Sequence, residues 1–402
     1  MATMLANGAA YLLSMIGARA LSVADYGALG ALLSVSIIGS TIALAAQAVG
    51  SRQMVLKALD RDRAVAETAG LASGATITMM VLGVVLFQPL ASVLGVPSLA
   101  VLLTFGAMAA SIPGFTALGI LQGREDHRGF GIAYSGIGLI RAAGGIVAML
   151  FVPTVTSASL GIFVGSVVGS ALSMVVGRLP LSLAWTGRPL VRELLHNSSA
   201  LVALFALANS DVLLARVFLD EDSSGGYAVG ALIAKIAFFL PYAIITIYFP
   251  RMSAAEDKKR AFLMALLMTA GMGVVVTAAC FLLGGPLVWI LAGAKYAALA
   301  PVAWLFALEG SIFAVMQVVL YAGFSTRARI VGLVPLAALA AQILAVSLWS
   351  HDTVLQILVV TIVAATASTI VGVWIELRPS RKESAHDGKA SLSAPEPRVE
   401  TS

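Results

Sequence analysis

The chain has 402 residues, of which 59% are hydrophobic and only 11% are charged, whereas ordinary soluble domains carry about 25% charged residues. A water-soluble globule cannot bury so many apolar side chains, so we expect an integral membrane protein. The formal net charge of +5 would suggest nucleic acid as the partner of a soluble chain. Here the basic residues cluster in short loops between apolar runs, which indicates membrane orientation and excludes a nucleic-acid partner.

The first apolar run, residues 5–21, contains the tripeptide Ala18-Arg19-Ala20, which has the form of a signal-peptidase site. No charged residue precedes the run, and Asn7 and Gly8 interrupt its apolar core. We therefore interpret it as a first transmembrane helix with one face toward a polar cavity. Its moderate hydropathy follows from that position.

Twelve runs are long and apolar enough for membrane-spanning helices, each of which needs about 20 residues. Six lie in the first half, at residues 5–21, 26–49, 68–90, 99–121, 129–152 and 158–176. Six follow in the second half, at residues 199–219, 227–249, 261–283, 297–324, 330–348 and 354–375. This pattern predicts an all-α, polytopic membrane protein of about 12 transmembrane helices.

The basic residues of the connecting loops lie almost entirely on one side of the predicted membrane. Alternate loops together with the C-terminal tail hold 20 of the 25 lysines and arginines. The opposite loops are four to seven residues long, and their only basic residue is Lys295. By the positive-inside rule, both termini are cytoplasmic.

An internal repeat relates the two halves of the chain. Residues 27–32 (GALGAL) match residues 227–232 (YAVGAL) at four of six positions, and the order of features around the two hexamers also agrees. Each hexamer lies in an apolar run that is followed by an arginine, Arg52 in the first half and Arg251 in the second. These two arginines correspond with a shift of one position relative to the hexamers. We therefore expect two pseudo-symmetric six-helix lobes, at residues 1–178 and 199–377.

Two further segments complete the predicted organisation. Residues 179–198 are the longest internal connection, and their leucines fall at helical spacing opposite charged residues, which predicts an amphipathic linker helix on the cytoplasmic surface. Residues 378–402 are rich in serine, proline and charge and predict a disordered cytoplasmic tail.

The sixth run contains Gly161, Gly165 and Gly169, one glycine every four residues. Small residues on one helix face allow close helix packing. We expect this face to pack inside the first lobe.

The chain shows no nucleotide-binding, zinc-protease or nucleophile-elbow motif, and no soluble stretch long enough for a catalytic domain. Its single cysteine, Cys280, lies in an apolar run, and its four histidines show no ligand spacing. We therefore predict a protein that is not an enzyme and that needs neither a metal nor a cofactor.

Charged residues within apolar runs are the best candidates for function, because a charge at the bilayer centre costs at least about 2.5 kcal/mol. Arg141 and Lys235 lie too far from helix ends to reach the interface easily, so we favour an internal role for both. The acidic residues Asp211 and Glu309 either neutralise these cations or take up a proton or sodium ion during transport.

Four further arginines lie near the ends of runs. Arg19 and Arg216 either extend to the outer interface or face the cavity. Arg52 and Arg251 either anchor the inner face or contact substrate. An excess of fixed positive charge around a cavity fits an anionic headgroup, whose phosphate oxygens need charge-assisted hydrogen bonds.

The amides of Gln47, Asn209, Gln317 and Gln342 lie within the same runs. They are able to bind a hydrophilic cargo, and hydrogen bonds between helices explain them equally well.

Residues 18–33, ARALSVADYGALGALL, followed by an apolar run to Arg52, resemble the opening of polysaccharide-biosynthesis flippases. These belong to the oligosaccharide-lipid branch of the multidrug/oligosaccharidyl-lipid/polysaccharide (MOP) exporter superfamily. The resemblance implies a MATE/MOP-like fold of two lobes around a cavity that alternates between the two membrane faces. It also implies a cationic cavity, which here would fall on Arg19, Arg141, Arg216 and Lys235.

Together, these features predict a bacterial plasma-membrane flippase for an oligosaccharide linked to polyprenyl pyrophosphate. Its expected partners, besides the lipid-linked oligosaccharide, are membrane lipids, a polysaccharide polymerase and glycosyltransferases. Two alternatives remain at this point: a cation-coupled, MATE-type antiporter of small molecules, and a lipid II flippase.

Overall fold

The computed structural model describes residues 2–182, 187–241, 244, 248, 258–323 and 328–377. Across these residues the regular structure is helical, without any β-strand, which confirms the predicted all-α class. Nine of the described helices are long and apolar enough to cross a membrane. The chain is therefore a multi-pass membrane protein. Arg251 and the predicted tail lie outside the described residues.

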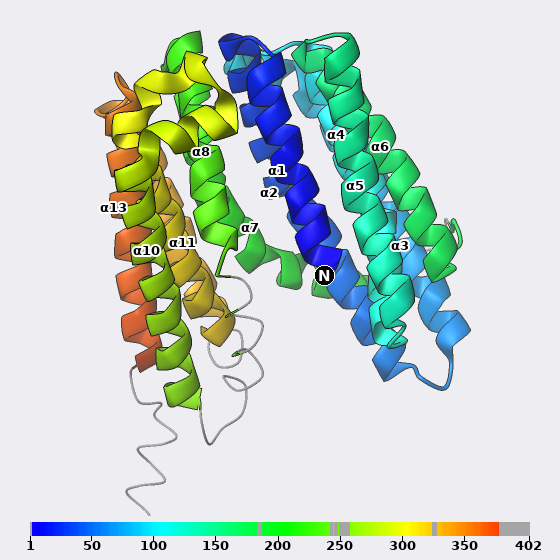
Figure 1. Ribbon diagram of the computed structural model, residues 1–402. Coiled ribbons are helices and arrows are strands. Elements are labelled where there is room, and N and C mark those ends of the chain that lie inside the picture. The colour runs from blue at the N-terminus through cyan, green and yellow to red at the C-terminus, as the bar shows by residue number, and fades with distance from the viewer. Residues whose placement is uncertain are drawn as a thin grey trace, which may run out of the picture.

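The first half of the chain forms one group of helices, seen on the right in Figure 1. α2 and α3 have 34 residues each, about 50 Å at 1.5 Å per residue, so they extend beyond a hydrocarbon layer of about 30 Å. All six helices overlap the predicted runs. The group comprises α1 (Ala2–Ala20), α2 (Val23–Leu56), α3 (Arg61–Leu94), α4 (Ser98–Gly123), α5 (His127–Phe151) and α6 (Val155–Gly177).

The second half forms the other group, on the left in Figure 1. It also contains six described α-helices, in agreement with the predicted six-plus-six arrangement, and a short 3₁₀ helix. These elements are α7 (Arg188–Phe218), α8 (Glu221–Phe239), α10 (Lys258–Ala292), η1 (Ala294–Val302), α11 (Ala303–Gly323), α12 (Ala328–Leu348) and α13 (Val354–Leu377).

Three boundaries in this half differ from the sequence prediction. The segment predicted as a surface helix is the start of α7, which continues from Arg188 to Phe218 without a break. α8 ends at Phe239, two residues before Pro241, whose ring and missing N–H disfavour its continuation. The predicted tenth span begins as η1, after a turn at Gly293 with φ of 92°, a conformation that favours glycine.

A kink divides α10 near the end that leads into η1. Leu283 leaves the helical conformation, with φ of −117° and ψ of 20°, three residues before Pro286. Proline removes one backbone hydrogen bond and clashes with the preceding turn, which accounts for the break. The last turns of α10 and η1 therefore cross the top of the second group in Figure 1.

The glycines of α6 pack against α5, as predicted. A Cβ atom on Gly161 would lie 2.1 Å from the carbonyl oxygen of Gly144, and one on Gly165 would lie 2.7 Å from the Cα atom of Arg141. These contacts leave no room for a side chain. The close approach of α6 fixes the part of α5 that carries Arg141.

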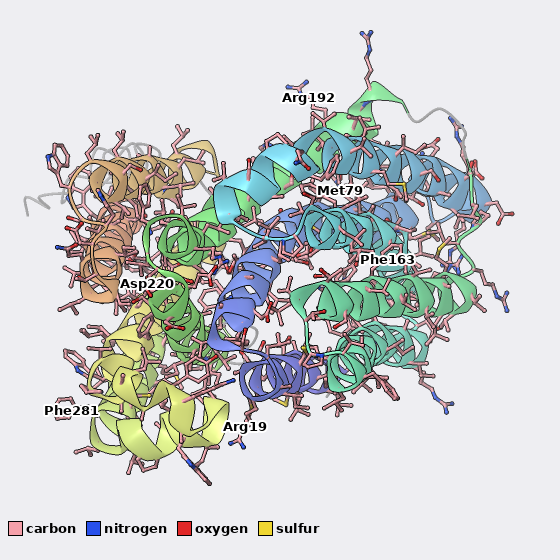
Figure 2. All side chains as sticks on the ribbon, turned by 90° about the horizontal axis from the view of Figure 1, so that it is seen from above. Arg19, Met79, Phe163, Arg192, Asp220 and Phe281 are labelled. Atoms are coloured by element: carbon pink, nitrogen blue, oxygen red, sulfur yellow. The ribbon has the colours of Figure 1, made fainter. Side chains whose placement is uncertain are left out.

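The two groups meet where α2 crosses α8. A Cβ atom on Gly27 would lie 2.9 Å from the backbone nitrogen of Gly225, and one on Gly30 would lie 2.7 Å from the Cβ atom of Ala228. Gly27, Gly30 and Ala228 belong to the repeat found in the sequence, and Gly225 lies two residues before it. Viewed from above, the groups lie side by side (Figure 2). Repeated segments that pack on each other are what a pseudo-twofold axis between two halves produces.

We predict opposite effects for two glycine-to-alanine substitutions. Gly165→Ala places a methyl group against the backbone of α5 and should lower stability by about 1–3 kcal/mol. Gly74→Ala, at a site with no atom within 4 Å of the new methyl, should raise it by about 0.5–1 kcal/mol. Thermal unfolding of the purified protein in detergent measures both. An unchanged midpoint for Gly165→Ala would contradict the packing described here.

Candidate functional site

Three adjoining cavities lie between the two groups of helices. The cationic chamber, of about 250 Å³, is lined by α1, α2, α4, α5 and α8 and contains Arg141 and Lys235. The carboxylate pocket, of about 20 Å³, contains Lys235, Asp211 and Glu309. The amide cavity, of about 520 Å³, contains Gln47, Gln122, Gln317 and Arg52 among its lining residues. Lys235 is shared by the first two cavities, and Phe239 lines all three.

Arg141 projects from α5 into the cationic chamber. Its Nη2 atom donates a hydrogen bond of 2.9 Å to the Ser36 hydroxyl of α2. Within the described part of the chain, no carboxylate forms an ion pair with this guanidinium. Its charge is therefore met by a neutral hydroxyl and remains available to an anion.

Lys235 lies on α8 at the boundary between the cationic chamber and the carboxylate pocket. Its Nζ atom lies 3.5 Å from the Ser34 hydroxyl, and its backbone carbonyl accepts a hydrogen bond of 3.2 Å from Tyr11 of α1. The ammonium group also interacts electrostatically with Asp211 and Glu309. No carboxylate of the described residues approaches it within 4 Å. Lys235 is thus placed to interact with groups in either cavity.

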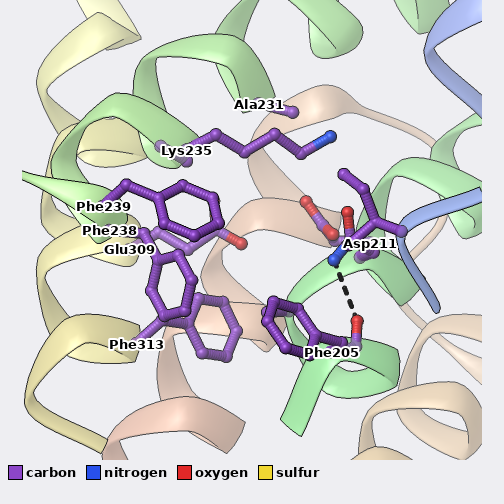
Figure 3. Close-up of a pocket in the computed structure, with 13 residues that line it drawn as sticks. Phe205, Asp211, Ala231, Lys235, Phe238, Phe239, Glu309 and Phe313 are labelled. Atoms are coloured by element: carbon purple, nitrogen blue, oxygen red, sulfur yellow. Dashed lines mark hydrogen bonds between the residues drawn. The ribbon is translucent and has the colours of Figure 1, made fainter. Parts of the chain in front are cut away.

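Asp211 of α7 and Glu309 of α11 are 2% and 1% exposed. Both carboxylate oxygens of Glu309 and one of Asp211 form no hydrogen bond of good geometry within the described chain, and the two carboxyl groups interact with each other. Figure 3 shows the two residues with Lys235 in a pocket that four phenylalanines, three alanines and Asn209 also line. Because an unpartnered buried charge costs several kcal/mol, these carboxyl groups require a proton or a bound cation.

Arg52 and Arg19 lie at opposite ends of the bundle. We call these the Arg52 end and the Arg19 end. The Nη1 atom of Arg52 forms an ion pair of 3.1 Å with Glu193 of α7, and the Arg52 side chain is 63% exposed. The pair joins the two groups of helices at the edge of the amide cavity. Its net charge is zero, and an exposed pair of this kind contributes at most about 1 kcal/mol.

Arg19 and Arg216 reach across to the other group of helices. Arg19, at the end of α1, donates to the carbonyls of Trp289 and Ile290, at 3.0 and 2.8 Å, in the last turn of α10. Arg216, at the end of α7, donates to the carbonyls of Leu94 and Gly95, at 2.9 and 3.0 Å, where α3 ends. Both cations therefore meet the negative end of a helix dipole. In Figure 2, Arg19 lies where the two groups approach each other.

Lys295 adds a third contact of the same kind. Its Nζ atom donates to the carbonyls of Leu21 and Arg19, at 2.5 and 3.4 Å, where α1 ends. We call the contacts made by Arg19, Arg216 and Lys295 the helix-end contacts. They join the two groups at the Arg19 end, whereas the amide cavity lies near Arg52.

The structure therefore divides the predicted substrate-binding arginines and lysine into separate places. Arg141 and Lys235 lie in one chamber, and Arg52 lines the neighbouring cavity. Arg19 and Arg216 line none of the three cavities; they make the helix-end contacts, because carbonyls at helix ends are within their reach. Arg251 lies outside the described residues.

The four amide residues named from the sequence also lie in different places. Gln47 and Gln317 line the amide cavity. Gln342 instead bonds Ser210 and Thr361 inside the second group, and Asn209, which lines the carboxylate pocket, donates to the Phe205 carbonyl of its own helix.

Sequence reasoning missed several residues that line the cavities. A single asparagine or tyrosine near a helix end carries no signal of its own in an apolar sequence. The missed lining residues are Asn7, Tyr11, Gln122, Tyr134 and Tyr321.

Comparison with known proteins relates the chain to transporters through its structure alone. No family model matches it, and no curated protein matches its sequence. A multidrug resistance MATE family transporter of the MOP superfamily, in an inward-facing conformation, superposes with a TM-score of 0.70 at 13% identity, over 97% of this chain and 96% of the other. A lipid II flippase, MurJ, in an inward closed conformation gives 0.73 at 12% identity, over 97% and 90%.

An outward-facing structure of a MATE family transporter gives a lower TM-score, 0.58 at 14% identity, over 96% of this chain and 95% of the other. The chain thus has the MATE/MOP fold.

We predict that the helix-end contacts hold the two groups together at the Arg19 end. In the double variant Arg19→Ala/Arg216→Ala, loss of bonds worth about 1.5–3 kcal/mol each should raise the separated population at least about tenfold. Nitroxide labels at Ser92 and Asp222, both exposed, with Cys280→Ala, report the distance between the groups by pulsed electron paramagnetic resonance.

Arg128→Ala is the matched control, because Arg128 is exposed at the other end. An unchanged distance distribution in the double variant would show that other contacts close this end.

Proposed function

We propose that this protein is a flippase that moves an oligosaccharide linked to polyprenyl pyrophosphate across the bacterial plasma membrane by alternating access. The observation that carries the proposal is the cationic chamber, in which Arg141 and Lys235 have no ion-pair partner within 4 Å among the described residues. A diphosphate supplies the charge and the acceptor oxygens that these donors lack. The membrane-embedded polyprenyl tail would remain in lipid.

The fold supports a transporter, and one neighbour by structure is a flippase for a lipid-linked substrate. By the positive-inside rule, the loop charges support a cytoplasmic Arg52 end and two cytoplasmic termini. The amide cavity would then lie toward the cytoplasm, where lipid-linked precursors are made. Closure at the Arg19 end corresponds to the loading state. We propose one lobe at residues 1–178 and a second that was predicted to begin at residue 199, that starts instead with α7 at Arg188, and that ends at residue 377.

We further propose that Asp211 and Glu309 couple transport to a cation. Ionised carboxylates would neutralise Lys235, whereas a proton or sodium ion bound at each carboxylate would cancel their charge and leave Lys235 to the diphosphate. Binding of the cation and of the anionic substrate would thus be positively linked. The buried, unpartnered oxygens of both carboxylates support this role over a purely structural one.

The same carboxylates favour the second candidate, a cation-coupled antiporter of small molecules. Such a carrier of organic cations would need acidic groups that reach the transported molecule. In this chain they lie in a pocket of about 20 Å³, whereas the larger chamber beside it holds Arg141. We therefore place the flippase first.

Neutral substitutions in the cationic chamber test the proposal directly. Arg141→Gln and Lys235→Gln should each weaken binding of a sugar-bearing polyprenyl diphosphate at least about tenfold, because a hydrogen bond to a charged group contributes about 1.5–3 kcal/mol. Purified protein in nanodiscs provides the binding measurement. Arg128→Gln, at an exposed arginine, should bind as the wild type does. Wild-type affinity in both chamber variants would refute the assignment.

Neutral mimics of the carboxyl groups test the coupling. Glu309→Gln and Asp211→Asn should still bind the diphosphate substrate but should lose the stimulation of transport by a proton or sodium gradient, since the amides cannot take up the cation. Proteoliposomes with imposed gradients measure this, with Asp352→Asn in an exposed loop as control. If both variants kept the full gradient response, the carboxyl groups would be structural.

A further inference from the structure

The amide cavity differs chemically from the cationic chamber beside it. Most of its polar groups are neutral hydrogen-bonding groups, from both helix groups. One cation and one anion lie at its edge, Arg52 and Glu193, and they form an ion pair with each other. Its neutral polar lining consists of Asn7, Gln47, Ser51, Gln122, Tyr134, Gln317 and Tyr321.

Two of these amides form a pair that leaves groups free for a ligand. The Gln47 amide nitrogen donates to the Gln122 side-chain oxygen at 3.1 Å, from α2 to α4. The pair therefore retains one carbonyl acceptor and one amide donor. If both amides were turned over together, the pair would still present one donor and one acceptor.

Gln317 supplies an unpartnered group from the opposite wall. Its side chain on α11 is 3% exposed, and its side-chain oxygen has no hydrogen-bond partner in the described chain. Such a buried acceptor costs about 1–3 kcal/mol unless a donor reaches it. Gln317 also lines the amide cavity, so a rotation of its side chain would present this acceptor to a ligand hydroxyl there.

We infer that the amide cavity is a subsite for neutral sugar residues, separate from the diphosphate position at Arg141 and Lys235; this inference rests on the proposed function. Sugar hydroxyls donate and accept at once, which matches amide side chains that offer both functions. The rings of Tyr134 and Tyr321 add apolar surface with a polar edge. The volume of about 520 Å³ lies within the range of about 300–1,000 Å³ for small-molecule sites.

The position of the cavity fits the order of groups in the substrate. The amide cavity and the cationic chamber share Asn7, Tyr134 and Phe239 as lining residues. A diphosphate bound at Arg141 and Lys235 would therefore project its first sugars into the amide cavity. Acidic sugars fit less well, because a carboxylate loses hydration there and meets neutral amides and an arginine that is already paired.

The experiment compares three ligands on purified protein in nanodiscs: a polyprenyl diphosphate without sugar, the same lipid with a neutral trisaccharide, and one with a trisaccharide of uronic acids. Wild type should bind the neutral form at least about tenfold more tightly than the other two. Gln47→Leu and Gln317→Leu should each reduce this preference severalfold and leave affinity for the sugar-free lipid unchanged. Gln88→Leu, an exposed glutamine on α3, is the control.

The outcomes separate the two proposals. If the protein binds both the sugar-free and the neutral sugar-bearing lipid, and the glutamine variants keep the wild-type preference, the subsite is refuted and the flippase proposal stands. Equal affinity for the uronic form refutes neutral selectivity. If wild type binds none of the lipids, the proposed function fails and the subsite fails with it. Should Gln317→Leu fold poorly, Gln122→Leu at an exposed position replaces it.

Discussion

The free-energy cost of an unpartnered charge in a low-dielectric helix bundle determines where the charged residues of this structure lie and what they bind. The protein meets that cost in different ways at different depths. Near one end, Arg19, Arg216 and Lys295 bind backbone carbonyls at helix ends, and near the other Arg52 pairs with Glu193. Between them, the charges of the chamber and of the carboxylate pocket have only hydroxyl groups or no partner among the described residues. The unsatisfied charges thus coincide with the cavities.

The helix-end contacts also follow the internal symmetry. α1 and α7 occupy equivalent positions in the two halves, and each ends in an arginine that binds the end of a helix in the other half. Reciprocal contacts of this kind form and break together when two bodies rotate about a pseudo-twofold axis. Contacts that break together favour two discrete states over a continuum, which is the behaviour that alternating access requires. The close crossing of α2 and α8 at their glycines brings the two halves near enough for these arginines to reach across.

The sequence was sufficient for the helix pattern, because hydropathy acts locally along the chain. Arg141 and Lys235 were singled out by their distance from helix ends, and both line the cationic chamber; their role in binding stays a prediction. The roles of Arg19 and Arg216 were not indicated by the sequence, because the carbonyls that they bind lie on α10 and α3, and a carbonyl has no signature in a sequence. Of the amide cavity, the sequence indicated Gln47 and Gln317 but not the pairing with Gln122, because Gln47 and Gln122 lie 75 residues apart and only packing brings them together. The kink at Leu283 had a local cause in Pro286, but its direction depends on tertiary contacts.

Under the proposed function, the protein must release its cargo as readily as it binds it, and the division of the cavities bears on that requirement. Neutral hydrogen bonds contribute about 0.5–1.5 kcal/mol each, so sugar contacts spread over both helix groups can be lost one by one as the groups move apart. A diphosphate held by two cations is harder to release, because its charge must be compensated at every stage. Lys235 offers a route: it lies beside both Asp211 and Glu309, and cation release from these carboxylates would restore their charge. Lys235 would then exchange the phosphate for the protein's own anions, so that the buried lysine gains a counter-charge as the cargo leaves.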